Sequence, residues 1–118
     1  MNIAIDYDGT YTEDPNLWLA FIRAMLVRGH AAYVVTMRYP SECNGEGGID
    51  KRLHQALVPV VCTSRQAKKP FCEEMGIIID VWCDDHPEAV NASADQIWGK
   101  ASPEGEVIIP ATRSAAVT

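Results

Sequence analysis

The sequence has no apolar run long enough to cross a membrane and no excess of basic residues. A membrane-spanning helix needs about 20 consecutive apolar residues, and no segment of this chain approaches that length. The net charge of −6 at pH 7 disfavours sequence-independent binding to nucleic acid, because such binding needs a basic surface. The N-terminal residues lack the basic start and longer apolar core of a signal peptide. We therefore expect a cytoplasmic protein with no membrane partner.

The four cysteines of the chain do not have the spacing of a zinc site. No two of the cysteines have the Cys-x-x-Cys spacing typical of such sites. Cys62 and Cys83 lie in apolar, strand-like runs, where a reduced cysteine behaves as a small hydrophobic residue. Cys43 lies in a polar segment that we expect to be a loop with an exposed thiol. This usage favours a reducing, intracellular setting.

The chain also lacks internal repeats and segments that resemble domain linkers. Its 118 residues are 47% hydrophobic and 22% charged, which is ordinary for a soluble globular protein. A chain of this length folds as one compact domain and buries roughly two-thirds of its unfolded surface. We predict a single domain over residues 1–118, with a core over about 2–98 and a tail over about 99–118 whose order the sequence does not define.

Apolar strand-like runs alternate with amphipathic helix-like segments along the chain. This alternation predicts an α/β fold with a Rossmann-like parallel sheet in three layers, helices lying on both faces. Asp14 before Pro15 is typical of a helix start, and Gly29 of a helix end. The predicted strands cover about residues 2–7, 31–36, 58–62, 77–82 and 107–109. The predicted helices cover about residues 15–28, 50–57, 70–75 and 87–98.

The most informative segment is residues 6–10, Asp-Tyr-Asp-Gly-Thr, which directly follows an apolar run at residues 3–5. Open α/β sheets build ligand sites from strands that bring polar groups to their C-terminal ends. Paired carboxylates bind Mg²⁺, and one of them can act as a nucleophile while the other transfers protons. The alternative interpretation is a strand that ends in a simple Asp-Gly turn.

Other polar side chains follow the ends of later predicted strands. Thr36 ends the second strand, and Asp84 and Asp85 follow the fourth. Because the carboxyl ends of parallel strands meet at one edge of the sheet, we expect these groups to lie beside Asp6 and Asp8. Four carboxylates placed together repel one another unless a cation lies among them, and Mg²⁺ prefers oxygen ligands. The sequence therefore predicts a Mg²⁺ site at this edge.

The order of these motifs resembles the haloacid dehalogenase superfamily, specifically its phosphatase branch. The resemblance covers about residues 2–90. It implies a hydrolase that removes phosphate from phosphate monoesters with Mg²⁺ as cofactor. The four motifs of that family match, in order, residues 6–10, Thr36, Lys69-Pro70 and Asp84-Asp85.

The resemblance implies a role for each matched residue. Asp6 would be the nucleophile that becomes an aspartyl-phosphate, and Asp8 would be the general acid and base. The implied phosphate-binding residues are Gly9, Thr36 and Lys69. The implied Mg²⁺ ligands are Asp6, Asp8 through its backbone carbonyl, Asp84 and Asp85. Tyr11 departs from the family pattern, because a small or aliphatic residue usually follows the first motif.

Two assignments stay open on the sequence. Lys68 and Lys69 are adjacent, and we favour Lys69 for the phosphate because its pairing with Pro70 places it at the predicted helix start. Lys68 is then a candidate substrate contact. Arg38 follows the second strand closely and is either another substrate contact or an ordinary surface residue.

Large members of the family carry a cap domain, and the segments between the motifs of this chain are too short to form one. The resemblance is therefore to a small, capless member with an open site. We expect a phosphorylated small molecule or nucleotide as the substrate. A nucleic-acid phosphate end and a phosphoprotein stay open as substrates, and so does assembly into a homo-oligomer.

Two other classes share parts of this pattern. Response-regulator receiver domains use an aspartate cluster, a hydroxyl and a lysine, but their phosphorylated aspartate follows the third strand. Here the third predicted strand ends at residues 62–64, Cys-Thr-Ser, with no aspartate. A catalytically silent binding or structural module on the same scaffold stays open as the alternative, although such a module has no need of the complete set of residues.

Overall fold

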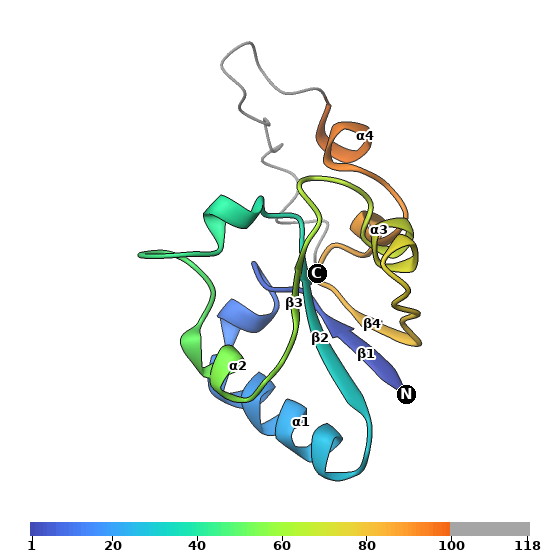
Figure 1. Cartoon of the computed structure of the whole chain (residues 1–118). Coiled ribbons are helices and arrows are strands. Elements are labelled where there is room, and N and C mark those ends of the chain that lie inside the picture. Colours follow the sequence, from blue (N-terminus) through green and yellow to red (C-terminus); the bar gives the residue numbers. More distant parts are fainter. Residues whose placement is uncertain (100–118) are drawn as a thin grey trace.

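The computed structural model describes residues 1–99, which form an α/β fold around one four-stranded sheet (Figure 1). The strands are β1 (Asn2–Ile5), β2 (Ala31–Thr36), β3 (Val60–Cys62) and β4 (Val81–Cys83). Their order in the sheet is β3-β2-β1-β4, and every neighbouring pair is parallel. The predicted α/β class with a parallel sheet is confirmed, and this strand order is compatible with a Rossmann-like layout.

Residues 1–99 also form four α-helices and three short 3₁₀ segments, of which the last helix and the last 3₁₀ segment follow β4. The α-helices are α1 (Pro15–Val27), α2 (Lys51–Gln55), α3 (Lys68–Glu74) and α4 (Ala94–Trp98). The 3₁₀ segments are η1 (Tyr11–Glu13), η2 (Pro40–Glu42) and η3 (Pro87–Val90). As predicted, Asp14 caps α1, because its Oδ1 accepts a hydrogen bond of 3.2 Å from Leu17 N.

Several strand boundaries differ from the predicted ones. β1 ends at Ile5 rather than at residue 7, and β3 begins at Val60 rather than at 58. β4 covers Val81–Cys83 rather than 77–82. Residue 77 is still bonded to the preceding helix, because Ile77 N donates to Cys72 O and closes the end of α3. The segment between this helix and β4 reaches β1 only at Asn2, where Asp80 N donates to Asn2 O at 2.8 Å.

Two helices also differ from prediction. α3 begins at Lys68 rather than at Pro70, and a proline is tolerated in the first turn because the first helical N–H groups have no partner within the helix. The predicted helix 87–98 is divided into η3 and α4, since Ser93 starts a new helix by accepting a hydrogen bond from Gln96 N. The predicted strand 107–109 lies outside the described residues.

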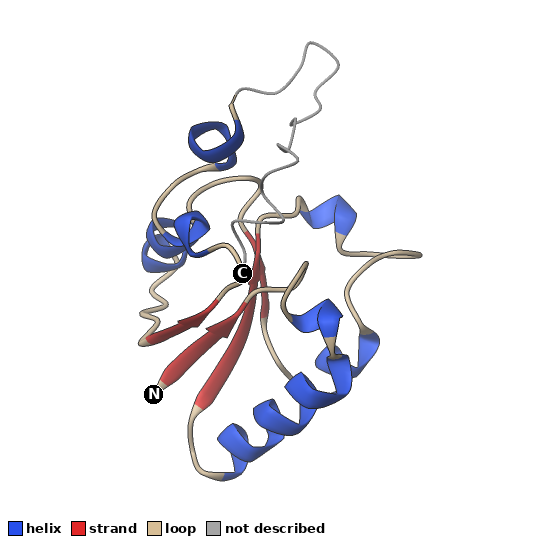
Figure 2. Cartoon of the chain, turned by 180° about the vertical axis from the view of Figure 1, so that it is seen from behind, coloured by secondary structure: helices blue, strands red, loops and turns tan. Residues whose placement is uncertain are grey.

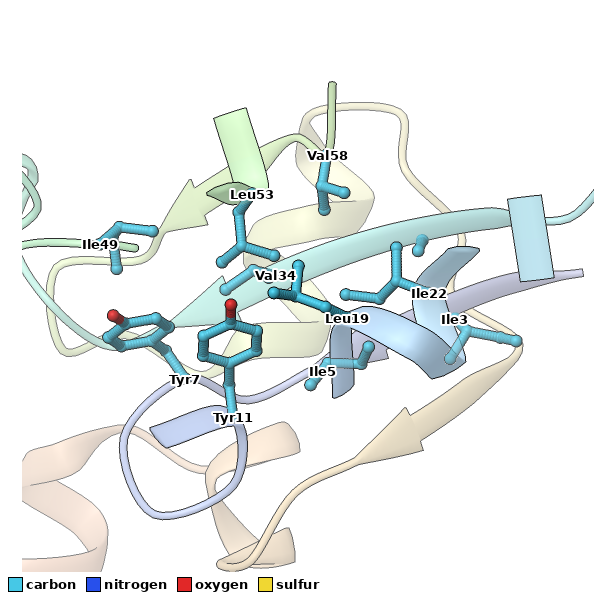
Figure 3. Close-up of a cluster of buried hydrophobic side chains, with 11 residues drawn as sticks. Ile3, Ile5, Tyr7, Tyr11, Leu19, Ile22, Val34, Ile49, Leu53 and Val58 are labelled. Carbon is cyan, nitrogen blue, oxygen red and sulfur yellow. The ribbon is translucent and has the colours of Figure 1, made fainter. Parts of the chain in front are cut away.

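Two clusters of buried side chains pack against the sheet. Side chains alternate along a strand, so Ile3 and Ile5 of β1 join the larger cluster with residues of α1 and α2, whereas Ala4 joins the smaller one with Cys72 of α3. Figures 1 and 2 show α1 and α3 on opposite sides of the strands. Figure 3 shows the larger cluster, in which Leu19 and Ile22 of α1 lie over the sheet.

Two tyrosines hold the turn that follows β1. Tyr7 and Tyr11 stack with ring centroids 5.3 Å apart, as Figure 3 shows. Tyr11 is completely buried, and its hydroxyl donates to Asp50 Oδ2 at 2.8 Å, while Asp50 N donates to the Tyr7 hydroxyl at 2.9 Å. Tyr11 therefore anchors this turn to the start of α2.

Ile22→Ala tests the main core. Ile22 is fully buried, so its truncation leaves a cavity and we expect a loss of about 2–5 kcal/mol in the free energy of unfolding. Val27→Ala, on the same helix at 87% exposure, is the matched control and should change stability by less than about 0.5 kcal/mol. Urea unfolding measures both. Equal effects would contradict this packing.

Asp50→Asn tests the tyrosine anchor through its pH dependence. Hydrogen bonding from Arg52 lowers the pKa of Asp50 to about 2. A carboxyl with a lowered folded-state pKa stabilises the fold above its unfolded pKa, and this contribution is lost as the pH falls towards the folded value. Between about pH 5 and pH 2, the wild type should therefore lose more stability than Asp50→Asn, by on the order of 1 kcal/mol.

The control for this pH experiment is Asp95→Asn, which changes an exposed carboxylate of α4. Its stability should follow the wild-type pH profile. If the stability of the wild type and that of Asp50→Asn change with pH in the same way, the Asp50 carboxylate does not contribute to the pH dependence of stability.

Candidate active site

A pocket of about 600 Å³ opens where β1, β2 and β4 end. Its lining includes Asp6, Thr36 and Asp84, each of which ends or directly follows one of these strands. The sequence predicted this convergence from the parallel order of the strands, and the structure brings these three residues together. Lys68, from the first turn of α3, also lines the pocket.

Lys68 lies between two aspartates at the base of the pocket. Its Nζ is 2.6 Å from Asp6 Oδ1 and 2.6 Å from Asp84 Oδ2. The three side chains are all nearly buried, with exposures of 2%, 9% and 3% for Lys68, Asp6 and Asp84. Lys69, which the sequence favoured for this position, is exposed and does not line the pocket. The preference for Lys69 fails because α3 begins earlier than predicted and turns Lys68 inward.

Burial and the neighbouring charges change the pKa values of Asp6 and Lys68. Burial raises the pKa of Asp6 to about 8, and Lys68 opposes that shift. Burial lowers the pKa of Lys68, but the two aspartates outweigh burial and raise it above its ordinary value. Lys68 therefore stays a cation, and the surrounding carboxylates need its charge.

A third aspartate completes the acidic group. One carboxylate oxygen each from Asp6, Asp84 and Asp85 lies within 4.8 Å of the others. Oxygen ligands from several carboxylates fit a hard divalent cation such as Mg²⁺, so this group could hold a metal ion. The carboxylate of Asp8 does not belong to this group, and the atom of Asp8 that the resemblance implies as a ligand is its backbone carbonyl oxygen.

Thr10 links the two ends of the acidic group. Its hydroxyl lies 3.2 Å from Asp6 Oδ2 and 3.2 Å from Asp85 Oδ1, and it accepts a hydrogen bond of 3.0 Å from Asp85 N. Gly9, beside it, has a φ of +87°, and a Cβ there would collide with the Asp85 carboxylate. Gly9 N donates to Thr12 Oγ1 at 3.0 Å. In this structure Gly9 therefore makes room for Asp85, and it does not line the pocket.

Asp8 faces Arg38 on the other side of the pocket. Arg38 Nε and Nη2 donate to the two oxygens of Asp8 at 2.8 Å and 2.7 Å. Arg38 Nη1 donates to the backbone carbonyls of Glu42 and Gly47 at 2.8 Å and 2.7 Å. Arg38 is therefore no ordinary surface residue, because it joins Asp8 to the loop that follows β2.

Thr36 also lines the pocket. It is 1% exposed, and its Oγ1 accepts a hydrogen bond of 3.3 Å from Arg38 N. Its position at the end of the central strand β2 agrees with the predicted one.

Several residues of the pocket were not among the site residues that the sequence predicted. Arg65 lines it and pairs with Glu42 at 3.0 Å. His86 is 6% exposed, and its ring lies 5.1 Å from that of Trp98, which also lines the pocket. The sequence offered a signal for two of them, because His86 adjoins the acidic pair and Arg65 follows the end of the third predicted strand, but no local pattern marks Trp98.

Comparisons of the chain with models of protein families, with curated proteins and with solved structures found no match. Among residues 1–99, no helix is both long and apolar enough to span a membrane. The geometry itself combines a cluster of carboxylates, a buried ammonium and a pocket. Such an arrangement can bind a cation together with an anionic group.

Lys68→Met tests the buried ion pairs. Without the ammonium, Asp6 and Asp84 are left buried with uncompensated charge, and we expect a loss of about 3–5 kcal/mol in the free energy of unfolding. Lys69→Met is the matched control and should change it by less than about 0.5 kcal/mol. Urea unfolding measures the stability of both variants. EDTA is present throughout, so that no divalent cation replaces the missing charge of Lys68. Equal losses in the free energy of unfolding for Lys68→Met and Lys69→Met would contradict the conclusion that Lys68 is the buried partner of Asp6 and Asp84.

Proposed function

We propose that this protein is a Mg²⁺-dependent phosphohydrolase that cleaves phosphate monoesters through an aspartyl-phosphate on Asp6. The observation that carries the proposal is the group of Asp6, Asp84 and Asp85 beside the ammonium of Lys68, at the base of a pocket. The resemblance of the ordered motifs to haloacid dehalogenase phosphatases supports the same activity. A three-layer, capless version of that fold is part of the proposal.

The chain's own residues supply most of the phosphate site. Lys68 and the hydroxyl of Thr36 line the pocket next to Asp6, where they would hold the phosphoryl oxygens. Mg²⁺, held by the three aspartates, would offset the repulsion between the phosphate and the attacking carboxylate. Lys68 takes the place that the motif comparison gave to Lys69.

The reaction needs two proton transfers and two nucleophiles, first Asp6 and then water. An oxygen of Asp6 attacks phosphorus, and the leaving oxygen departs with a proton from Asp8. Asp8 then takes a proton from the water that cleaves the aspartyl-phosphate, so that inorganic phosphate leaves and Asp6 is restored. In the structure Arg38 holds Asp8 as a charged partner. Its role as an acid therefore requires this ion pair to open when the substrate binds, which frees Arg38 to contact the substrate.

The pocket favours a small substrate. Its volume of about 600 Å³ lies within the range of small-molecule sites, and the net charge of −6 disfavours long polyanions. We therefore propose a phosphorylated small molecule or a nucleotide. A nucleic-acid end and a phosphoprotein are the other substrates to test.

One observation also favours a catalytically silent module. Lys68 already pairs with Asp6 and Asp84, and Arg38 already pairs with Asp8. This set of ion pairs can stabilise the fold without any reaction. Activity measurements separate the two candidates.

Asp6→Asn and Asp8→Asn test the mechanism on a panel of aryl phosphates, nucleotides, sugar phosphates, 3′- and 5′-phosphorylated oligonucleotides and phosphopeptides, with and without Mg²⁺. Asp6→Asn removes the nucleophile and should abolish turnover. Asp8→Asn removes the proton donor and should lower kcat by about 10²–10⁴-fold. Wild-type turnover should disappear in EDTA and return with Mg²⁺.

Glu73→Gln is the control, because it changes an exposed carboxylate of α3 that does not line the pocket. Circular dichroism shows that each variant is folded. A wild-type rate in Asp6→Asn would falsify the mechanism. No turnover on the whole panel, together with no Mg²⁺ binding by calorimetry, would favour the silent module.

A further inference from the structure

Two thiols lie in contact between the loop that follows β2 and the end of β3, and the proposed reaction does not use either. Cys43 Sγ and Cys62 Sγ are 2.7 Å apart, and neither cysteine is part of a disulfide. Both side chains are partly buried. Because a sulfur–sulfur bond measures about 2.05 Å, a small movement of either side chain would bring the two sulfurs to bonding distance.

The backbone holds both cysteines in these positions. Cys62 is the last residue of β3 and is in register with Thr36 of β2. Cys43 N donates to Pro40 O at 3.1 Å, and Cys43 O accepts a hydrogen bond of 3.0 Å from Ile49 N. Gly48 packs so closely on Cys43 O that a Cβ at residue 48 would be too close to it. The contact between the thiols therefore follows from fixed main-chain positions.

Residues 37–49, which we call the 37–49 loop, already dock on the end of β3 at a second point. Arg65 pairs with Glu42 at 3.0 Å and lies 4.9 Å from the centre of the Tyr39 ring. Arg65 Nη1 also donates to Met37 O at 2.7 Å. A bond between the thiols would thus reinforce an existing contact rather than distort the loop.

We propose that Cys43 and Cys62 form a reversible intramolecular disulfide that ties the 37–49 loop to the end of β3. The oxidant is a small-molecule disulfide. The Cys43 thiolate attacks one sulfur of it and releases one thiolate, which leaves a mixed disulfide on Cys43. Cys62 then loses its proton and attacks the Cys43 sulfur, which releases the second thiolate. Two protein thiols are oxidised, and one small-molecule disulfide is reduced to two thiols.

The order of the two steps follows from the surroundings of the sulfurs. Burial and the neighbouring Cys43 thiol raise the pKa of Cys62 to about 12, so Cys62 is a poor first nucleophile. The contribution of the Cys43 thiol disappears once Cys43 carries the mixed disulfide, and Cys62 then lies next to the sulfur that it must attack. The disulfide does not depend on the proposed phosphatase activity.

The experiment treats the folded protein with oxidised glutathione and digests it with trypsin without reduction. Trypsin cleaves after Arg38, Lys51, Arg52 and Arg65, so Cys43 and Cys62 fall in the separate peptides 39–51 and 53–65. We expect mass spectrometry to find these two peptides joined, and dithiothreitol to separate them. We also expect Tm to rise by about 5 °C or more on oxidation, because the bond closes a loop of the unfolded chain.

Single cysteine variants show which two cysteines form the bond. Cys43→Ala and Cys62→Ala should each lose both the joined peptides and the rise in Tm, whereas Cys83→Ala, at another partly buried cysteine, should keep both. A stable glutathione adduct on Cys43 in the wild type would overturn the proposal. So would a bond from either cysteine to Cys72 or Cys83, or four unreacted thiols in the folded protein. If Cys62→Ala does not fold, Cys43→Ala still tests the pair, because Cys43 lies in a loop.

Discussion

The rest of the site depends on the buried ammonium of Lys68. An uncompensated charge in a buried position costs several kcal/mol, and Lys68 Nζ, 2.6 Å from an oxygen of Asp6 and from one of Asp84, supplies the opposite charge that opposes the rise in the pKa of Asp6. The two aspartates directly follow the neighbouring strands β1 and β4. Their ion pairs with Lys68 therefore also join α3 to the sheet at the edge where the pocket opens.

One ammonium does not balance the whole acidic group. Three carboxylates, Asp6, Asp84 and Asp85, carry three negative charges when ionised, and Lys68 offsets one, which leaves two. Within residues 1–99, no arginine or second lysine forms an ion pair with any of the three. The hydroxyl of Thr10 offsets part of the repulsion. The remaining charge is the physical reason to expect a divalent cation at this position.

The sequence predicted the convergence of Asp6, Thr36 and Asp84, because this depends only on strand order, and parallel strands end at a common edge. It could not choose between Lys68 and Lys69. Successive residues of a helix point in directions about 100° apart, so a shift of the helix start changes which lysine faces the sheet. The contact of Cys43 with Cys62 was also beyond the sequence, since it depends on the path of a loop with no periodic pattern.

Arg38 couples the proposed acid to the 37–49 loop. Two of its nitrogens bind the carboxylate of Asp8, and the third binds two backbone carbonyls of that loop. Opening the ion pair to free Asp8 therefore releases a planar side chain whose other hydrogen bonds shape the loop. The thiols of Cys43 and Cys62 hold the same loop from the side of β3. If the two cysteines form the proposed bond, it would restrict the loop whose backbone Arg38 binds, and in the proposed reaction this would oppose the release of Asp8.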